Sequence, residues 1–234
     1  MTTTMVPVTK MAGQENGRQS NFSRVIGEEC LVLLDHLGLA HADRPPAARA
    51  LGMTSCLPAE GVTTIAAQTA VAAATHLRLR TVLVDCNFAR PGVHRTFGVG
   101  LCPGLRDAVE EEMPPADVLR PSGVELLSLV TAGTVQKDTA AAWLSPHMAR
   151  LVEELRAEFE LVLFDLPSLN QSRQMRIGTL LDGIVLVVEA ERVQWEVAQR
   201  ATAALKSAGV DLLGAVLNKR RQHLPGWLGQ KMEV

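Results

Sequence analysis

The sequence predicts a doubly wound, three-layer α/β/α domain built on a mostly parallel sheet. Short segments that are apolar on both faces alternate with longer segments of helical spacing, and this alternation is typical of parallel sheets covered by helices on both sides. Of the 234 residues, 47% are hydrophobic but only 3% are aromatic, so Ala, Val and Leu are expected to form the core. A chain of this length suffices for one sizeable domain.

The expected elements follow one another along the chain. The strands expected from short apolar runs are Ala50–Thr54, Thr81–Val84, Glu125–Leu129, Leu161–Phe164, Ile184–Val188 and Leu212–Leu217. The helices expected between them are Thr63–Leu77, Leu105–Glu112, Pro146–Glu158 and Val193–Ala208. In doubly wound sheets ligands bind at the carboxyl ends of the strands, so the functional site is expected there.

The two ends of the chain differ in composition from this domain, which is expected over residues 22–222. Residues 1–21 are polar and aperiodic and are expected to form a disordered arm. An amphipathic helix is expected over residues 25–39, and two adjacent prolines predict a linker over residues 41–48. Residues 223–234 form a short basic tail with two interpretations, a solvated end or a segment that docks on a membrane partner or anionic lipid.

Charge, cysteine content and hydropathy narrow the class of protein. The formal net charge of −2 argues against a nucleic-acid partner, because binding to a phosphate backbone needs a basic surface. The four cysteines form no CxxC pair, which argues against a metal site and fits a reducing compartment. The sequence shows neither a signal peptide nor an apolar run of the roughly 20 residues that span a bilayer. A cytoplasmic protein is therefore expected.

The segment from Thr54 to Ala67 follows an expected strand and opens an Ala-rich helix, which is the context of a phosphate-binding loop. Gly61 lets the backbone approach phosphates closely. Amide groups at the start of the helix would point at the anion, aided by the helix dipole. Thr63 is placed to ligate Mg²⁺ through its hydroxyl.

The loop resembles the S-x-x-P-G-E-G-K-[ST]-T phosphate loop of bacterial tyrosine kinases of the CpsD, CapB and Wzc type, relatives of the MinD and ParA ATPases. The residues that match this pattern are Ser55, Pro58, Glu60, Gly61, Thr63 and Thr64. Ala59 replaces a glycine, and Val62 replaces the lysine that binds phosphate in the family. The resemblance implies a P-loop NTPase fold, with ATP and Mg²⁺ as ligands of this loop.

The replacement at Val62 predicts weaker binding and slower chemistry. No lysine occurs between Lys10 and Lys137, so no neighbouring turn is expected to supply one, and Arg90 is the candidate for partial compensation. A charge-assisted hydrogen bond contributes roughly 1.5–3 kcal/mol, so its loss is expected to weaken ATP binding about 10- to 100-fold. Loss of one preorganised donor typically lowers a rate by about 10²–10³.

A second resemblance lies between Thr81 and Gly98, which match an apolar run followed by D-x-D-x-R-R-P-x-x-H-x-x-F-G. The matching residues are Asp85, Arg90, Pro91, His94, Phe97 and Gly98. Asn87 replaces the second aspartate, and Ala89 replaces the first arginine. In the family these aspartates organise Mg²⁺ and help to activate the attacking hydroxyl. An amide at position 87 cannot act as a base, which is a second chemical loss.

Two further residues complete the candidate site. Asp165 ends an apolar run that resembles the family's Walker B segment, with Ser168 in place of its second proline. By resemblance Asp165 would hold Mg²⁺ through water, together with Asp85 and Thr63, and Asn218 would contact the adenine base. The alternative for both Asp165 and Asn218 is an ordinary turn residue.

Several features bear on activity and assembly. The chain has no tyrosine, which excludes the autophosphorylation of a tail tyrosine cluster that the family performs. The family's E-x-x-R-x-x-R oligomerisation motif would fall near Glu28 or Glu29, where its arginines are missing, so a ring is not expected and another homo-oligomer stays open. Cys56 and Cys86 each follow a strand near the site. Buried unreactive thiols are favoured there over a redox switch.

The leading hypothesis is a catalytically impaired pseudo-kinase of bacterial exopolysaccharide or capsule synthesis or export. By resemblance it would regulate a membrane-bound polysaccharide copolymerase or chain-length regulator at the inner face of the plasma membrane. One alternative is a residually active kinase or ATPase acting in trans. Another is a MinD- or ParA-like positioning protein, which is disfavoured because the extra lysine at the start of its loop is absent.

Overall fold

One eight-stranded sheet organises the computed structural model, which describes residues 5–9, 19–40, 48–135, 142–143, 145–169 and 175–220. The strand order is β1-β8-β7-β2-β6-β3-β5-β4. The strands are β1 Met5–Thr9, β2 Arg49–Ser55, β3 Thr81–Asp85, β4 Leu119–Pro121, β5 Leu127–Val130, β6 Leu161–Asp165, β7 Gly183–Glu189 and β8 Leu212–Arg220. The β4 strand is antiparallel to β5, whereas the other neighbours pair in parallel.

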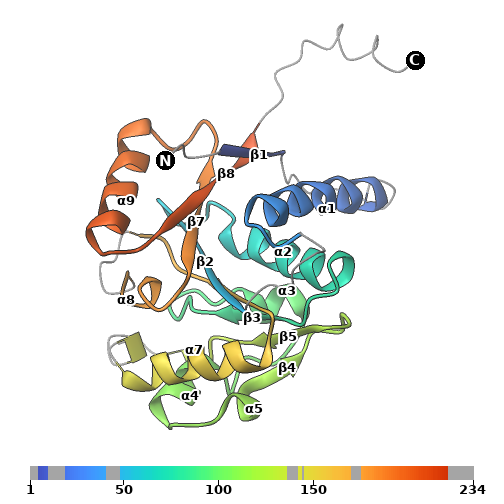
Figure 1. Cartoon of the computed structure of the whole chain (residues 1–234), viewed down its shortest axis with the longest axis vertical. Coiled ribbons are helices and arrows are strands. Elements are labelled where there is room, and N and C mark those ends of the chain that lie inside the picture. The colour runs from blue at the N-terminus through green and yellow to red at the C-terminus, as the bar shows by residue number, and fades with distance from the viewer. Residues whose placement is uncertain are drawn as a thin grey trace, which may run out of the picture.

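Helices cover both faces of this sheet. They are α1 Gln19–His36, α2 Val62–His76, α3 Val93–Phe97, α4 Leu105–Glu110, α5 Pro115–Val118, α7 Pro146–Glu158, α8 Met175–Gly178 and α9 Trp195–Ser207. Figure 1 shows α1 and α2 on one side of the sheet and α8 and α9 on the other. The layers are therefore helix, sheet and helix.

The β6 strand shows how the sequence specifies these layers. Leu161 and Leu163 pack in the core cluster that contains α1 and α2, whereas Val162 and Phe164 pack in the cluster that contains α4 and α7. Successive side chains of a strand point to opposite faces, so a central strand must be apolar throughout when both faces are covered. Many small Ala side chains of α2 are buried, which lets this helix lie close to the strands.

The predicted three-layer fold is confirmed. Each strand expected between residues 50 and 217, and each helix expected between those strands, corresponds to an observed element whose ends shift by at most three residues. The pattern missed β4, α3, α5 and α8. These elements have three to five residues each, which is too short to display a periodicity.

The N-terminal segment differs from the expectation. The α1 helix begins at Gln19 rather than at Val25, and β1 lies within the arm for which no regular structure was expected. This strand pairs in parallel with β8 at the edge of the sheet, so it depends on a partner distant in sequence. The rest of the arm, residues 41–47 of the expected linker and the basic tail lie outside the described residues.

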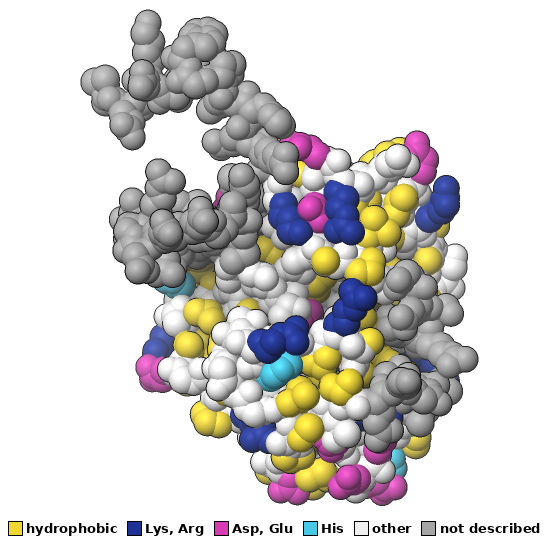
Figure 2. Space-filling model, turned by 180° about the vertical axis from the view of Figure 1, so that it is seen from behind, with side chains coloured by type: hydrophobic (Ala, Val, Ile, Leu, Met, Phe, Trp, Pro, Cys, Tyr) yellow, Lys and Arg dark blue, Asp and Glu magenta, His cyan; other side chains and the backbone are white. Residues whose placement is uncertain are grey.

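The surface of the described part is mixed in character. Figure 2 shows Lys and Arg side chains dispersed among apolar and acidic ones on one face of the molecule. None of the helices in the described ranges combines the length and the apolarity that crossing a membrane requires.

Candidate functional site

The loop between β2 and α2 has the backbone shape expected of an anion-binding turn. Gly61 precedes the first residue of α2 and has a φ of 95°, a left-handed conformation that L side chains rarely adopt. A Cβ atom at this position would collide with Nδ2 of Asn218. Glycine is therefore required at position 61 both by its backbone angles and by the close approach of β8.

Three consecutive carbonyl groups of this loop are held by side chains from the neighbouring strand ends. The Arg192 guanidinium donates to the Pro58 carbonyl at 3.1 Å, and Lys219 Nζ donates to the Ala59 carbonyl at 2.8 Å. Asn218 Nδ2 donates to the Glu60 carbonyl at 2.8 Å. The loop is thus fixed from outside through three of its carbonyl groups.

Glu60 stabilises the same loop through its carboxylate, and its contact with a nucleotide stays a prediction. One carboxylate oxygen accepts from the Leu57 amide at 2.7 Å, and the other accepts from the Glu189 amide at 2.9 Å. Burial raises the pKa of Glu60, and these backbone donors oppose that rise. The matched glutamate of the motif therefore ties the loop to the end of β7.

Val62 occupies the lysine position of the motif as the first residue of α2. Its side chain is 8% exposed and belongs to the core cluster of α1 and α2. Thr63 and Thr64 follow it on the first turn of the helix, and both line the cleft described below. The loop consequently offers hydroxyl and amide groups but no cation of its own.

Asp85 and Asp165 lie side by side at the carboxyl ends of β3 and β6, where they are register partners. Both are buried, and neither oxygen of Asp165 has a hydrogen-bond partner. Burial and the nearby charge of Asp85 raise the pKa of Asp165 well above its usual value. The adjacent Thr63 hydroxyl lowers this pKa, although its geometry falls outside that of an ordinary hydrogen bond.

The loop after β3 forms the opposite wall. Asn87 Oδ1 accepts from the Arg90 amide at 3.1 Å, so the amide that replaces the family's second aspartate closes a local turn. Ala89 and the exposed Arg90 side chain both line the cleft. The arginine expected to compensate for the lost lysine is therefore placed at the site.

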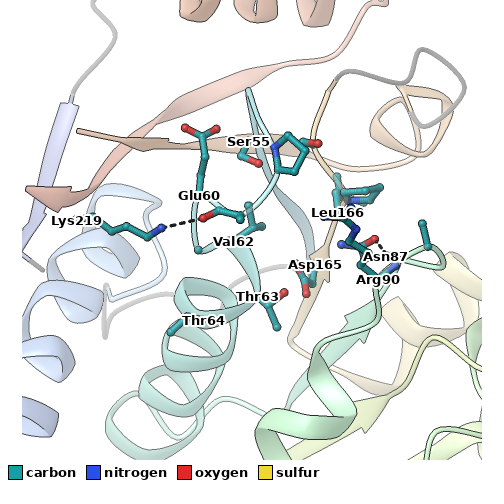
Figure 3. Close-up of a pocket in the computed structure, with 16 residues that line it drawn as sticks. Ser55, Glu60, Val62, Thr63, Thr64, Asn87, Arg90, Asp165, Leu166 and Lys219 are labelled. Atoms are coloured by element: carbon teal, nitrogen blue, oxygen red, sulfur yellow. Dashed lines mark hydrogen bonds between the residues drawn. The ribbon is translucent and has the colours of Figure 1, made fainter. Parts of the chain in front are cut away.

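These segments enclose a cleft of about 530 Å³ (Figure 3). It is lined by Ser55, Pro58, Ala59, Glu60, Gly61, Val62, Thr63, Thr64, Asn87, Ala89, Arg90, Asp165, Leu166, Pro167, Ser168 and Lys219. The structure thus brings the three sequence motifs together. Asp85 lies behind this lining and accepts three backbone hydrogen bonds, from Asn87, Gly92 and Val93.

Asn218 is also behind the lining. It is 2% exposed, and its Oδ1 accepts from the Lys219 amide while its Nδ2 holds the loop. Its contact with adenine stays a prediction, and the structure adds a role in closing the loop onto β8.

Sequence reasoning missed Lys219. A search limited to turns near the loop found no substitute lysine, but this one reaches the cleft from the end of β8. Its position directly after Asn218, a residue already assigned to the site, was the available signal.

The cysteines near the site are separated and poorly ionised. Cys56 and Cys86 are both buried and free, and they belong to different core clusters. They follow β2 and β3, which are separated by β6. Burial and the Glu60 charge raise the pKa of Cys56 to about 11. Burial also raises the pKa of Cys86 well above its usual value, as do the charges of Asp85 and Asp165. These features support unreactive thiols.

Several named proteins are similar in sequence to this chain, although no protein-family model matches it. The tyrosine-protein kinase YwqD of Bacillus subtilis is 28% identical over 195 residues, which cover 83% of this chain and 81% of YwqD. The succinoglycan biosynthesis transport protein ExoP of Rhizobium meliloti is 29% identical over 175 residues, which cover 73% of this chain but 22% of ExoP.

Solved structures share the fold. The kinase domain of the Escherichia coli tyrosine kinase ETK superposes with a TM-score of 0.78 at 18% identity, covering 94% of this chain and 91% of that domain. MinD from Pyrococcus horikoshii, solved with Mg-ADP, gives a TM-score of 0.64 at 22% identity, covering 80% of this chain and 78% of MinD.

The fold is that of the P-loop ATPases represented by MinD. In sequence the chain is similar to bacterial tyrosine-protein kinases, as the resemblance of its motifs predicts.

Proposed function

We propose that this protein is a nucleotide-binding pseudo-kinase that regulates the synthesis or export of a bacterial capsule or exopolysaccharide. The observation that carries the proposal is the contrast within one loop. Its backbone shape is held by Gly61 and by three side chains from neighbouring strand ends, while the Val62 side chain belongs to the hydrophobic core. The cradle for a nucleotide is retained, and its catalytic cation is lost.

The residues present fit Mg²⁺ and a nucleotide. Asp165 has two buried oxygens without hydrogen-bond partners, beside a second buried carboxylate and the Thr63 hydroxyl. Magnesium is usually bound through one or two carboxylates together with phosphate oxygens and water. Thr63 and Asp165 would hold the ion, and Asp85 would support them from behind. The bound ion would neutralise phosphate charge.

Chemistry beyond binding is weakened in two places. The loop lacks the lysine that would stabilise charge on the transferred phosphoryl group. The Asn87 side chain accepts a hydrogen bond from its own turn and is an amide, which cannot act as a base. Binding without fast turnover is therefore the expected behaviour.

The polysaccharide context comes from the relatives. ExoP is named as a succinoglycan biosynthesis transport protein, and its similarity covers most of this chain. We infer by homology that the pseudo-kinase acts at the inner face of the plasma membrane on a membrane-bound copolymerase or chain-length regulator. The nucleotide-bound and free forms would bind this partner with different affinities.

Calorimetry with Mg·ATP, paired with a hydrolysis assay, tests the proposal. We expect measurable binding and a hydrolysis rate about 10²- to 10³-fold lower than that of an ordinary kinase, because one preorganised donor is missing. Hydrolysis at ordinary kinase rates would overturn the pseudo-kinase assignment. Absence of any binding would overturn the assignment of the cleft.

A second candidate, a slow kinase or ATPase that acts on a partner in trans, is favoured by the place of Arg90 at the cleft. It predicts that Arg90→Ala abolishes a measurable phosphotransfer. Arg95→Ala is the matched control, because Arg95 is exposed on α3 and does not line the cleft. Equal activity of both variants would eliminate the arginine mechanism.

A further inference from the structure

Two cations line the cleft among the residues that the structure describes. Arg90 lies on the wall that carries Asn87, whereas Lys219 lies on the side of the phosphate loop (Figure 3). The cation that this chain lacks, because Val62 replaces the family's lysine, would also lie on the loop side of the cleft. Lys219 therefore carries a positive charge on the side of the cleft where the loop has none.

The end of β8 aims Lys219 at the loop. The residue has a φ of 57°, an uncommon conformation for a side chain other than glycine. Its amide donates to Oδ1 of Asn218, and Asn218 in turn holds the Glu60 carbonyl. Lys219 Nζ ends 2.8 Å from the Ala59 carbonyl. Backbone conformation and side-chain contacts thus fix the ammonium group one residue from the Glu60–Gly61 peptide.

The ammonium group is only partly engaged in this position. Nζ donates to the Ala59 carbonyl and lies 3.1 Å from Glu189 Oε2, and a lysine ammonium has three donors. Its side chain is 34% exposed, so the third donor is not shut off from the cleft. A phosphate could thus be bound without breaking either contact.

Glu189 has a second cationic partner besides Lys219. Arg192 pairs with the same oxygen at 2.8 Å. Partial burial raises the pKa of Glu189, but its hydrogen bonds to Arg192 and Lys219 bring this pKa below the usual value. Glu189 would therefore keep its pairing with Arg192 if Lys219 turned further into the cleft.

We propose that Lys219 is a phosphate-binding residue of the nucleotide site and supplies from β8 the positive charge that Val62 removed from the loop. This inference rests on the proposed function, because it requires that the cleft bind a nucleotide. The ligand class is a nucleoside di- or triphosphate. Adenosine lacks the group that Lys219 would contact.

Calorimetric titration of the full chain with Mg·ATP, Mg·ADP, AMP and adenosine tests the inference in three proteins. These are the wild type, Lys219→Met and the matched control Arg192→Met. Arg192 also joins Glu189 to a loop carbonyl but does not line the cleft. We expect Lys219→Met to weaken ATP binding about 10- to 100-fold while adenosine binding stays unchanged. Arg192→Met should keep the wild-type preference for ATP over adenosine.

Each result decides a separate point. Equal losses in both variants for every ligand would show that Lys219 only supports the loop and would overturn the inference. Wild-type affinities in Lys219→Met would overturn it as well. If the wild type binds none of the four ligands, the proposed function fails and the inference fails with it. Lys219→Gln, which keeps a polar side chain, provides the same comparison should the methionine variant not fold.

Discussion

Asp85 and Asp165 are register partners on neighbouring strands, yet their carboxylates have opposite surroundings. Asp85 accepts backbone hydrogen bonds from Asn87 at 2.9 Å, Gly92 at 2.8 Å and Val93 at 3.0 Å. Asp165 is equally buried and accepts none. One carboxylate therefore stabilises the loop that follows β3, whereas the other is a source of strain that a divalent cation would relieve.

Asp165→Asn is expected to raise the free energy of unfolding at neutral pH. An unsatisfied buried group costs about 1–3 kcal/mol and a charged one more, so its neutralisation should recover part of that amount. The folded-state pKa of Asp165 is raised, so stability from this group is present at low pH and is lost as pH rises toward that pKa. The gain from the substitution should vanish near about pH 4. Urea unfolding at both pH values measures it, and no gain at neutral pH would contradict the assignment.

Asp85→Asn is expected to have the opposite effect. An amide can accept hydrogen bonds through one oxygen only, and its NH₂ group would face a backbone donor. Loss of charge-assisted hydrogen bonds should lower the free energy of unfolding by about 1.5–3 kcal/mol. This loss is opposed because the substitution also removes the repulsion with Asp165 and the burial of a charge, which raises the pKa of Asp85. The same urea experiment checks this, and a stabilised variant would show that the repulsion outweighs the three hydrogen bonds.

Mg²⁺ should stabilise the wild type through the same carboxylates. In the presence of ADP, millimolar Mg²⁺ is expected to raise the melting temperature of the wild type and to leave Asp165→Asn nearly unchanged, because the ion would lose a negatively charged ligand. Differential scanning fluorimetry with and without EDTA measures the difference. An equal Mg²⁺ response in both proteins would place the ion elsewhere.

Val62→Lys should restore the family's loop cation. Val62 lines the cleft as well as the core, so a longer side chain has an open direction. We expect Mg·ATP to bind about 10-fold more tightly, since a charge-assisted hydrogen bond is gained. Val62→Met is the control, because it adds length without charge. Equal ATP affinities of the two variants in calorimetry would refute the gain.

The fold and the meeting of the motifs could be predicted from the sequence, because parallel strands end at one edge of a sheet. Asp85 and Asp165 are far apart in sequence but are placed together by this rule. The same periodicity could not predict β1, whose pairing with β8 is a tertiary contact.

The uses of individual side chains could not be predicted in this way. The ligand contacts that residue types suggested for Glu60 and Asn218 stay predictions, and the hydrogen bonds by which both side chains hold the loop could not be foreseen. Lys219 was missed because its reach depends on the strand order β8-β7-β2, which brings the end of β8 near a loop that follows β2. Pattern matching compares positions along one segment and contains no such information.

Gly61→Ala should separate two costs that this position combines. Its φ of 95° strains any L side chain, and a Cβ atom would also meet Asn218 Nδ2. Gly209 is the matched control, since its φ is 72° and nothing lies within 4 Å of a Cβ there. Gly209→Ala is expected to lower the free energy of unfolding by about 1–2 kcal/mol from backbone strain alone. Gly61→Ala should lose about 1–3 kcal/mol more through overpacking, and only this variant should bind Mg·ATP more weakly.

Adding Asn218→Ala should recover the overpacking part but not the strain. If the two glycine variants were equally stable in urea, Asn218 would be able to move away from a Cβ atom at position 61 at little cost. The proposal that β8 holds the phosphate loop rigidly would then be wrong.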